Sequence, residues 1–177
     1  MRKTVSVLMA VMLMAVLCTA SADEPVLLTS FDCADLEGNP VDISLFDGAQ
    51  VVLVDIWEAW CGWCLKEMPD LCELYELNKD QGFLIVGLSG VSSAEGYDAK
   101  TTAEELGITY PLVNGTEEML PVELEGFPTT LVYQRQENGD LQLADVVAGY
   151  MPREDWNAYL KAYMPDFVTE GGQPENK

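Results

Sequence analysis

The 177-residue chain contains no histidine, and this absence removes several classes of enzyme. Hydrolases that use histidine as a general base are excluded, and so are metal sites built on imidazole ligands. Covalent haem attachment is excluded as well, because Leu65 follows Cys64 where a haem motif requires histidine. The chemistry of this chain must therefore come mainly from its cysteines and carboxylates.

Basic residues are scarce, since 9 lysines and arginines stand against 30 aspartates and glutamates, for a net charge of −21. A protein of this charge repels nucleic-acid phosphates and anionic lipids. The sequence therefore predicts that the protein has no nucleic-acid partner. Most of the charge is expected to be an ordinary solvated acidic surface, which favours solubility.

Long apolar runs are also scarce, and residues 5–17 form the one that stands out. Arg2 and Lys3 precede this run, and the small residues at 20–22 follow it as a cleavage signal. The pattern predicts a secretory signal peptide over residues 1–22, with an uncleaved signal that anchors the chain in the membrane as the alternative. The protein is thus expected outside the cytoplasm, in the periplasm, the cell envelope or the medium.

Residues 51–69 are the stretch around which the rest of the chain is organised. An apolar run predicts a buried strand, and Cys61-Gly-Trp-Cys64 follows it at the start of a helical pattern. A cysteine at a helix N-terminus faces unpaired N–H groups and the positive end of the helix dipole, which favour the thiolate. Cys64 lies one turn further along the helix, close enough to form a disulfide. We predict a redox-active pair with Cys61 as the nucleophile; a static disulfide or half of a zinc site are the alternatives.

The remaining cysteines of the expected mature chain, Cys33 and Cys72, leave two possibilities open. Cys72 falls on the predicted core-facing stripe of the helix, which favours a buried free thiol. An even number of cysteines in an oxidising compartment instead favours a structural Cys33–Cys72 disulfide. Neither cysteine belongs to a second Cys-X-X-Cys motif, which argues against a zinc site.

Asp55 is an acid inside the apolar run, six residues before Cys61. A buried carboxylate is costly unless its pKa rises, because burial disfavours the charged form. A carboxyl group with a raised pKa is suited to accept a proton at neutral pH. The sequence therefore makes Asp55 a candidate proton acceptor for Cys64.

The predicted elements alternate between strands and helices, which indicates an α/β fold. We expect a central mixed sheet flanked by helices, preceded by an N-terminal β-hairpin extension. The domain is expected to span residues 23–164, followed by a disordered tail over residues 165–177. Strands are expected near 26–31, 41–45, 51–57, 83–88, 108–113, 131–133 and 141–148, and helices near 62–78, 94–106, 116–121 and from 152 onward.

Four segments together resemble the thioredoxin superfamily, and within it the exported TlpA-like branch that includes the reductases of cytochrome c maturation. They are Val-Asp-Ile-Trp at 54–57, Trp-Cys-Gly-Trp-Cys at 60–64, Lys-Glu-Met-Pro at 66–69 and Gly-Phe-Pro-Thr-Thr at 126–130. The resemblance covers residues 31–164 and is specific because the motifs occur together at the expected distances. One departure is Trp63, which replaces the proline of thioredoxins and leaves the reduction potential open.

The resemblance implies roles for residues around the dithiol. Asp55 would lie beneath it, and Glu67 would be a second proton-handling group, with a solvated helix acid as the alternative for Glu67. Pro128 would be a cis-proline whose loop lies opposite the dithiol and pairs with the substrate backbone. The expected substrate-binding residues are Trp60, Trp63, Phe127, Pro128 and Thr129.

The sequence thus predicts a monomeric extracytoplasmic thiol–disulfide oxidoreductase that acts on protein disulfides and dithiols. It is expected to need no cofactor or metal and to receive electrons from a membrane thiol donor. Three alternatives stay open: a disulfide-forming oxidant, a non-catalytic binding module with a structural Cys61–Cys64 bridge, and a thiol peroxidase. The peroxidase would need threonine where Glu58 stands.

Overall fold

A computed structural model of the protein describes residues 24–92 and 94–170, so the predicted signal peptide lies outside the described residues. Seven strands form one sheet in the order β2-β1-β5-β4-β3-β6-β7. The central strands β3, β4 and β5 are parallel, and the other pairs are antiparallel. The strands are β1 Cys33–Asp35, β2 Pro40–Val41, β3 Val51–Ile56, β4 Phe83–Ser89, β5 Leu112–Asn114, β6 Thr129–Arg135 and β7 Leu141–Ala148. The predicted mixed sheet is confirmed.

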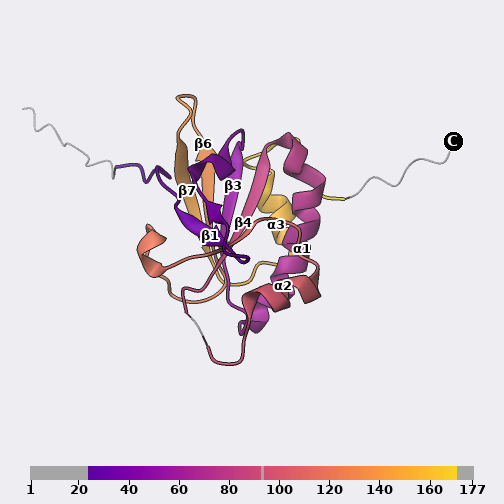
Figure 1. Cartoon of the computed structure of the whole chain (residues 1–177). Helices are drawn as coiled ribbons and strands as arrows, with labels where there is room; N and C mark the ends of the chain where they lie inside the picture. The colour runs from indigo at the N-terminus through magenta and orange to yellow at the C-terminus, as the bar shows by residue number, and fades with distance from the viewer. Residues whose placement is uncertain (1–23, 93, 171–177) are drawn as a thin grey trace, which may run out of the picture.

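The α-helices α1 (Gly62–Asn78), α2 (Ala99–Leu106) and α3 (Arg153–Leu160) pack on one face of the sheet (Figure 1). Short 3-10 helices complete the chain: η1 Ile43–Phe46, η2 Lys79–Gln81 and η3 Glu117–Met119. The opposite face of the sheet is covered by the N-terminal segment, by η1 and by residues 119–124. The sheet therefore separates two cores, one beneath the helices and one beneath irregular segments.

The N-terminal hairpin exists but is shorter than predicted. Residues 41–45 were expected to be a strand, and this is wrong beyond Val41, because η1 begins at Ile43. The cause is local, since the Asp42 carboxylate accepts the Ser44 N–H at 2.9 Å and caps a helical turn. The first expected strand is reduced to a single bridge between Leu27 and Gln142.

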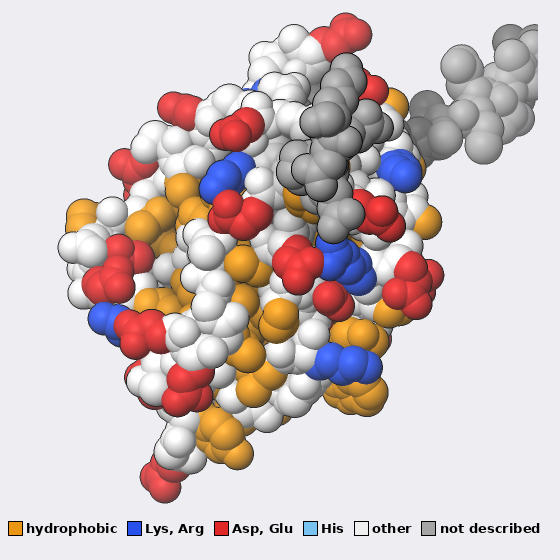
Figure 2. Space-filling view, turned by 90° about the vertical axis from the view of Figure 1, so that its right-hand side faces the viewer, with side chains coloured by type: hydrophobic (Ala, Val, Ile, Leu, Met, Phe, Trp, Pro, Cys, Tyr) orange, Lys and Arg blue, Asp and Glu red, His pale blue; other side chains and the backbone are white. Residues whose placement is uncertain are grey.

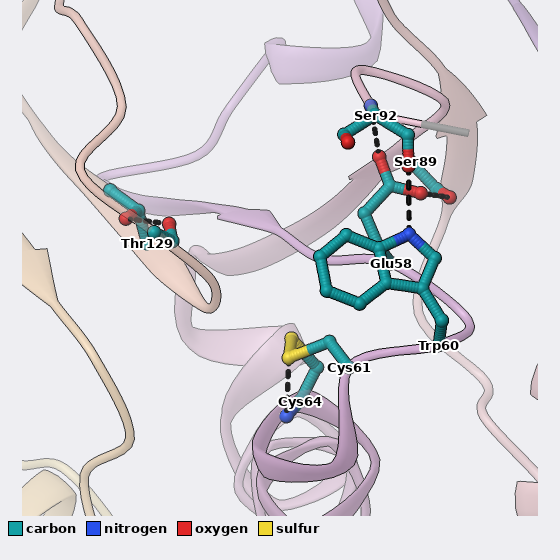
Figure 3. Close-up of a disulfide and its surroundings, with 8 residues drawn as sticks. Glu58, Trp60, Cys61, Cys64, Ser89, Ser92 and Thr129 are labelled. Atoms are coloured by element: carbon teal, nitrogen blue, oxygen red, sulfur yellow. Dashed lines mark hydrogen bonds between the residues drawn. A yellow bond between two sulfur atoms is a disulfide. The ribbon is translucent and has the colours of Figure 1, made fainter. Parts of the chain in front are cut away.

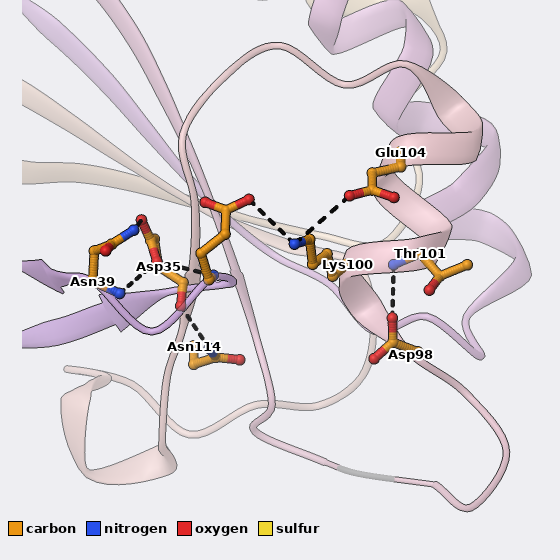
Figure 4. Close-up of polar contacts among 8 residues, drawn as sticks. Asp35, Asn39, Asp98, Lys100, Thr101, Glu104 and Asn114 are labelled. Carbon is orange, nitrogen blue, oxygen red and sulfur yellow. Dashed lines mark hydrogen bonds and ion pairs between the residues drawn. The ribbon is translucent and has the colours of Figure 1, made fainter.

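Helix α2 also begins later than predicted, at Ala99 instead of residue 94. Asp98 is its N-cap, and the Asp98 carboxylate accepts the Thr101 N–H at 2.7 Å. Lys100, on the first turn of α2, lies 3.6 Å from Glu37 of the β1–β2 turn. This pair links the hairpin to the helical layer, and Figure 4 shows Lys100 on α2 facing the turn that carries Asp35 and Asn39.

The packed chain continues past residue 164, where the tail was expected to begin. Phe167 is buried and its ring meets that of Phe83 edge-on at 5.2 Å. The Val168 N–H donates to Asn78 Oδ1 at 2.8 Å. Residues 171–177 of the expected tail lie outside the described residues.

Acidic side chains are spread over the face of the molecule that carries the helices, and blue Lys and Arg side chains are few (Figure 2). This distribution agrees with the solvated acidic surface expected from the composition. Within the described residues, no helix combines the length and apolar character required to cross a bilayer.

Candidate functional site: a disulfide at the start of helix α1

Cys61 and Cys64 form a disulfide at the point where the chain passes from β3 into α1, with their Cα atoms 5.3 Å apart. Cys61 is the N-cap of α1, and the Cys64 N–H points at Cys61 Sγ at 3.1 Å (Figure 3). Backbone N–H groups and the helix dipole therefore meet the Cys61 sulfur. When the bridge is reduced, this environment favours the Cys61 thiolate.

Cys61 is the more exposed member of the pair, as expected, but the difference is small. It is 6 % exposed, whereas Cys64 is fully buried. The neighbouring indoles are far more open, at 37 % for Trp60 and 58 % for Trp63. Of the two cysteines, only Cys61 therefore has any surface open to a partner.

Thr129, the first residue of β6, lies on the other side of the disulfide from Glu58 and Trp60 in the view of Figure 3. The Phe127–Pro128 peptide bond is cis, which matches the expectation for Pro128. The Phe127 ring lies 5.5 Å from the Trp60 ring in an edge-on contact. Thr129 is buried, and its hydroxyl donates to the Gly126 carbonyl at 2.8 Å. The Thr129 side chain thus supports the loop from within.

Trp63 belongs to a second aromatic contact beside the disulfide. The Trp63 ring lies 5.3 Å from the ring of Tyr150, a residue that the sequence pattern did not indicate. Lys66 Nζ lies 4.4 Å from the Tyr150 ring centroid and 5.2 Å from that of Trp63. The rim of the disulfide is therefore apolar and aromatic, with one cation, on a protein that is otherwise strongly acidic.

Asp55 lies in the core on the helix-facing side of β3. It is 1 % exposed, and neither of its carboxylate oxygens has a hydrogen-bond partner. Burial raises the pKa of Asp55 well above its ordinary value, and the charge of Glu67 raises it further. The predicted buried acid is therefore present.

Glu67 is equally buried, at 1 % exposure, so the alternative that it is a solvated helix acid is wrong. Its Oε1 accepts the Met151 N–H and the Trp156 indole N–H, each at 2.8 Å. Its Oε2 has no partner. Burial raises the pKa of Glu67, and the two hydrogen bonds oppose that rise.

Glu58 is a site residue whose structural role the sequence reasoning missed, because it was considered only as a mismatch to a peroxidase motif. It is 3 % exposed, and its carboxylate accepts the Ser92 N–H at 2.6 Å. Ser92 in turn accepts the Trp60 indole N–H on its carbonyl at 2.8 Å. Glu58 thereby fixes the loop after β4 against the Trp60 side of the disulfide (Figure 3). The available signal was an acid directly after a buried apolar strand.

The hypothesis of a Cys33–Cys72 disulfide is wrong, because both cysteines are free. They lie on opposite faces of the sheet, since Cys72 belongs to the core beneath the helices and Cys33 packs against the other core. Cys72 is buried, with Sγ 3.3 Å from the Thr109 hydroxyl. The alternative of a buried free thiol is confirmed for Cys72.

The chain is similar in sequence to some known proteins and in structure to others. The chain is 28% identical over 137 residues to the thiol-disulfide oxidoreductase ResA of Geobacillus kaustophilus, covering 76% of this chain and 75% of that protein. A thiol:disulfide interchange protein of Chlorobium tepidum superimposes with a TM-score of 0.65 at 23% identity, over 78% of this chain and 96% of its own. One from a Bacteroides species gives a TM-score of 0.58 at 29% identity, over 85% and 92%.

The fold and the site define a thiol–disulfide oxidoreductase with a thioredoxin-like fold. The sequence model of the AhpC/TSA family matches residues 27–136, which is more than half of the chain. The protein belongs to the AhpC/TSA family, and its structural neighbours are thiol:disulfide interchange proteins.

Proposed function

We propose that this protein is an extracytoplasmic reductase or exchanger of protein disulfides that acts through a mixed disulfide. The observation that carries the proposal is the Cys61–Cys64 pair, which lies at the N-terminus of α1 beside the exposed Trp60 and Trp63. The similarity of the chain to ResA and to thiol:disulfide interchange proteins supports the proposed disulfide chemistry. The extracytoplasmic location rests on the signal-like pattern of residues 1–22.

The reaction begins with the reduced protein. The Cys61 thiolate attacks one sulfur of the substrate disulfide, an S–S bond forms between the two proteins, and one substrate thiolate leaves. Cys64 then transfers its proton to Asp55 and attacks Cys61 Sγ, which releases the second substrate thiolate. Two electrons have then passed to the substrate, and Cys61–Cys64 is oxidised. A membrane dithiol donor would reopen the bridge, and Asp55 would return the proton to Cys64.

The exposure of the two cysteines supports these roles. A visiting sulfur meets Cys61 because Cys64 has no exposed surface. Cys64 nevertheless stays within bonding distance of Cys61 along the first turn of α1. Trp60, Trp63, Phe127 and the Pro128 loop would supply the apolar contact area that holds a polypeptide during the exchange.

The proposal is tested by trapping. A Cys64→Ser variant should accumulate mixed disulfides through Cys61, because the resolving thiol is missing. These species should appear on non-reducing gels and disappear with dithiothreitol. Cys72→Ser is the matched control, since it removes a buried thiol on the same helix and should trap nothing. A Cys64→Ser variant that captures no protein would favour the non-catalytic binding module.

The direction of electron flow has its own test, because Trp63 replaces the usual proline between the cysteines. A Cys61/Cys64 potential near about −270 mV would identify a reductase, and one near about −120 mV a disulfide-forming oxidant. Equilibration with graded glutathione or dithiothreitol buffers measures this potential.

A further inference from the structure

Most of the buried polar atoms without partners in the described structure lie in one part of it. All but one of them belong to four residues that lie in the core between the sheet and α1: Asp55, Trp57, Glu67 and Tyr110. The exception is an oxygen of Asn157, in α3. Folded proteins provide hydrogen-bond partners for nearly all buried polar groups. A cluster of unpaired groups therefore indicates that its members interact with one another, directly or through water.

Gly87 creates the space in which these groups meet. It is the partner of Asp55 across the parallel β3–β4 pair, where neighbouring strands run about 4.8 Å apart. A Cβ atom at Gly87 would lie 3.1 Å from Trp57 Nε1 and 3.1 Å from Tyr110 Cε2. Leu112 Cδ2 would lie nearer still, at 2.5 Å, so the Leu112 side chain, the indole N–H and the edge of the phenol ring together occupy the place of a side chain beside Asp55.

The groups around this space are chemically complementary. Asp55 offers two acceptor oxygens, while the Trp57 N–H and the Tyr110 hydroxyl are donors. The buried polar and charged residues of the described chain include no lysine or arginine, so no buried cation neutralises Asp55. Hydrogen bonds are then the remaining means of stabilising its charged form.

The electrostatics of Tyr110 agree with this placement. Burial raises the pKa of Tyr110 well above its ordinary value, and the charge of Asp55 is the next largest cause. The other titratable groups that face Tyr110 come from α1: Glu67, Cys72 and Tyr75, whose ring lies 6.2 Å away. Tyr110 thus stays protonated and remains a hydrogen-bond donor throughout the working pH range.

We propose that Tyr110 is a positioning residue for the disulfide chemistry. Its hydroxyl and the Trp57 N–H both donate hydrogen bonds to an internal water, and that water donates a hydrogen bond to the Asp55 carboxylate. This water-mediated contact stabilises the ionised Asp55 that takes the proton of Cys64. Tyr110 itself gains and loses no proton. The inference rests on the proposed function, since it gives Asp55 the role of proton acceptor.

The test is the pH dependence of the resolving step. A mixed disulfide between Cys61 and thionitrobenzoate is prepared, and its release by Cys64 is followed by absorbance in stopped flow. Tyr110→Phe should move the midpoint of the rate–pH profile upward by about one unit, which slows release roughly tenfold below the midpoint. Tyr133→Phe, a buried tyrosine on the opposite face of the sheet, is the matched control and should leave the midpoint unchanged.

Two further variants separate the possible failures. Asp55→Asn should remove the titration, and Trp57→Phe should shift the midpoint in the same direction as Tyr110→Phe but less. If Asp55→Asn removes the titration while Tyr110→Phe leaves it unchanged, the role of Tyr110 is overturned and the proposed function stands. If Asp55→Asn leaves the profile unchanged, both the role of Asp55 and the role of Tyr110 are overturned. Trapping by Cys64→Ser is independent of either result.

Discussion

The two faces of the central sheet are built from the same strands but packed with different chemistry. On β3, Val52, Val54 and Ile56 point into an apolar core covered by the N-terminal segment and η1. The alternate positions face the helices, and there the apolar sequence is interrupted by Asp55. On the first face, β3 contributes only apolar side chains. The second face accepts buried acids that cost stability, and the proposed role of Asp55 as a proton acceptor would account for that cost.

The largest expected effect comes from placing an acid on the face that lacks one. Val54→Asp puts a carboxylate into the apolar core with no donor arranged around it. We expect a loss of about 3–5 kcal/mol in the free energy of unfolding, measured by urea denaturation at pH 7. Val54→Ala is the control for lost volume and should cost about 2 kcal/mol. Equal losses in the two variants would contradict the difference between the faces.

Removing the acid from the dithiol face should have the opposite effect on stability and a large effect on activity. Asp55→Asn should slow disulfide exchange about 100-fold at pH 7, as expected for a lost proton acceptor. The same variant should be more stable than the wild type at neutral pH by about 1–3 kcal/mol.

The pH dependence of that stability difference has a defined sign. The pKa of Asp55 is raised in the folded state, so the unfolded chain releases the proton first as pH rises. Wild-type stability should therefore fall from about pH 4 upward, through the folded-state pKa, whereas Asp55→Asn should lack this component. Denaturation curves at several pH values measure the difference in unfolding free energy between Asp55→Asn and the wild type. If this difference became smaller with rising pH, the raised pKa of Asp55 would be contradicted.

A smaller effect is expected at the surface of the dithiol rim. Trp63→Ala removes the most exposed indole beside the disulfide and should raise the KM for a protein substrate about 5–10-fold with little change in kcat. Ile43→Ala removes an exposed apolar side chain of η1, on the side of the other core, and should leave KM unchanged. Insulin reduction supplies the assay, and equal KM changes in the two variants would remove Trp63 from the docking surface.

The smallest expected effect concerns the support of that rim. Glu58→Gln keeps the shape of the side chain but weakens its charge-assisted bond to the Ser92 N–H. We expect KM to rise about threefold, together with a change in Trp60 fluorescence, because Ser92 also holds the Trp60 indole. Glu95→Gln, an exposed acid on the same loop, should change neither.

Much of the site was predictable because its signals are local. The buried strand, the two cysteines one helical turn apart and the acid inside an apolar run are all visible in consecutive residues. The bounds of α1 were predicted as Gly62 to Asn78, and the structure has the same bounds. Predictions failed where a short capping motif outweighed the apolar pattern, as at Asp42 and Asp98.

The sequence by itself determined the chemistry of the protein: a dithiol at a helix start, with a carboxylate fixed six residues before it on the preceding strand. These relations span only a few residues, so strand and helix geometry sets them. Only the tertiary structure decided that Glu67 is buried, that Cys33 and Cys72 lie apart, and that Tyr110 reaches the space beside Asp55. Those facts depend on which distant segments of the chain lie side by side in the fold. Long-range packing decides this, and no local sequence pattern encodes it.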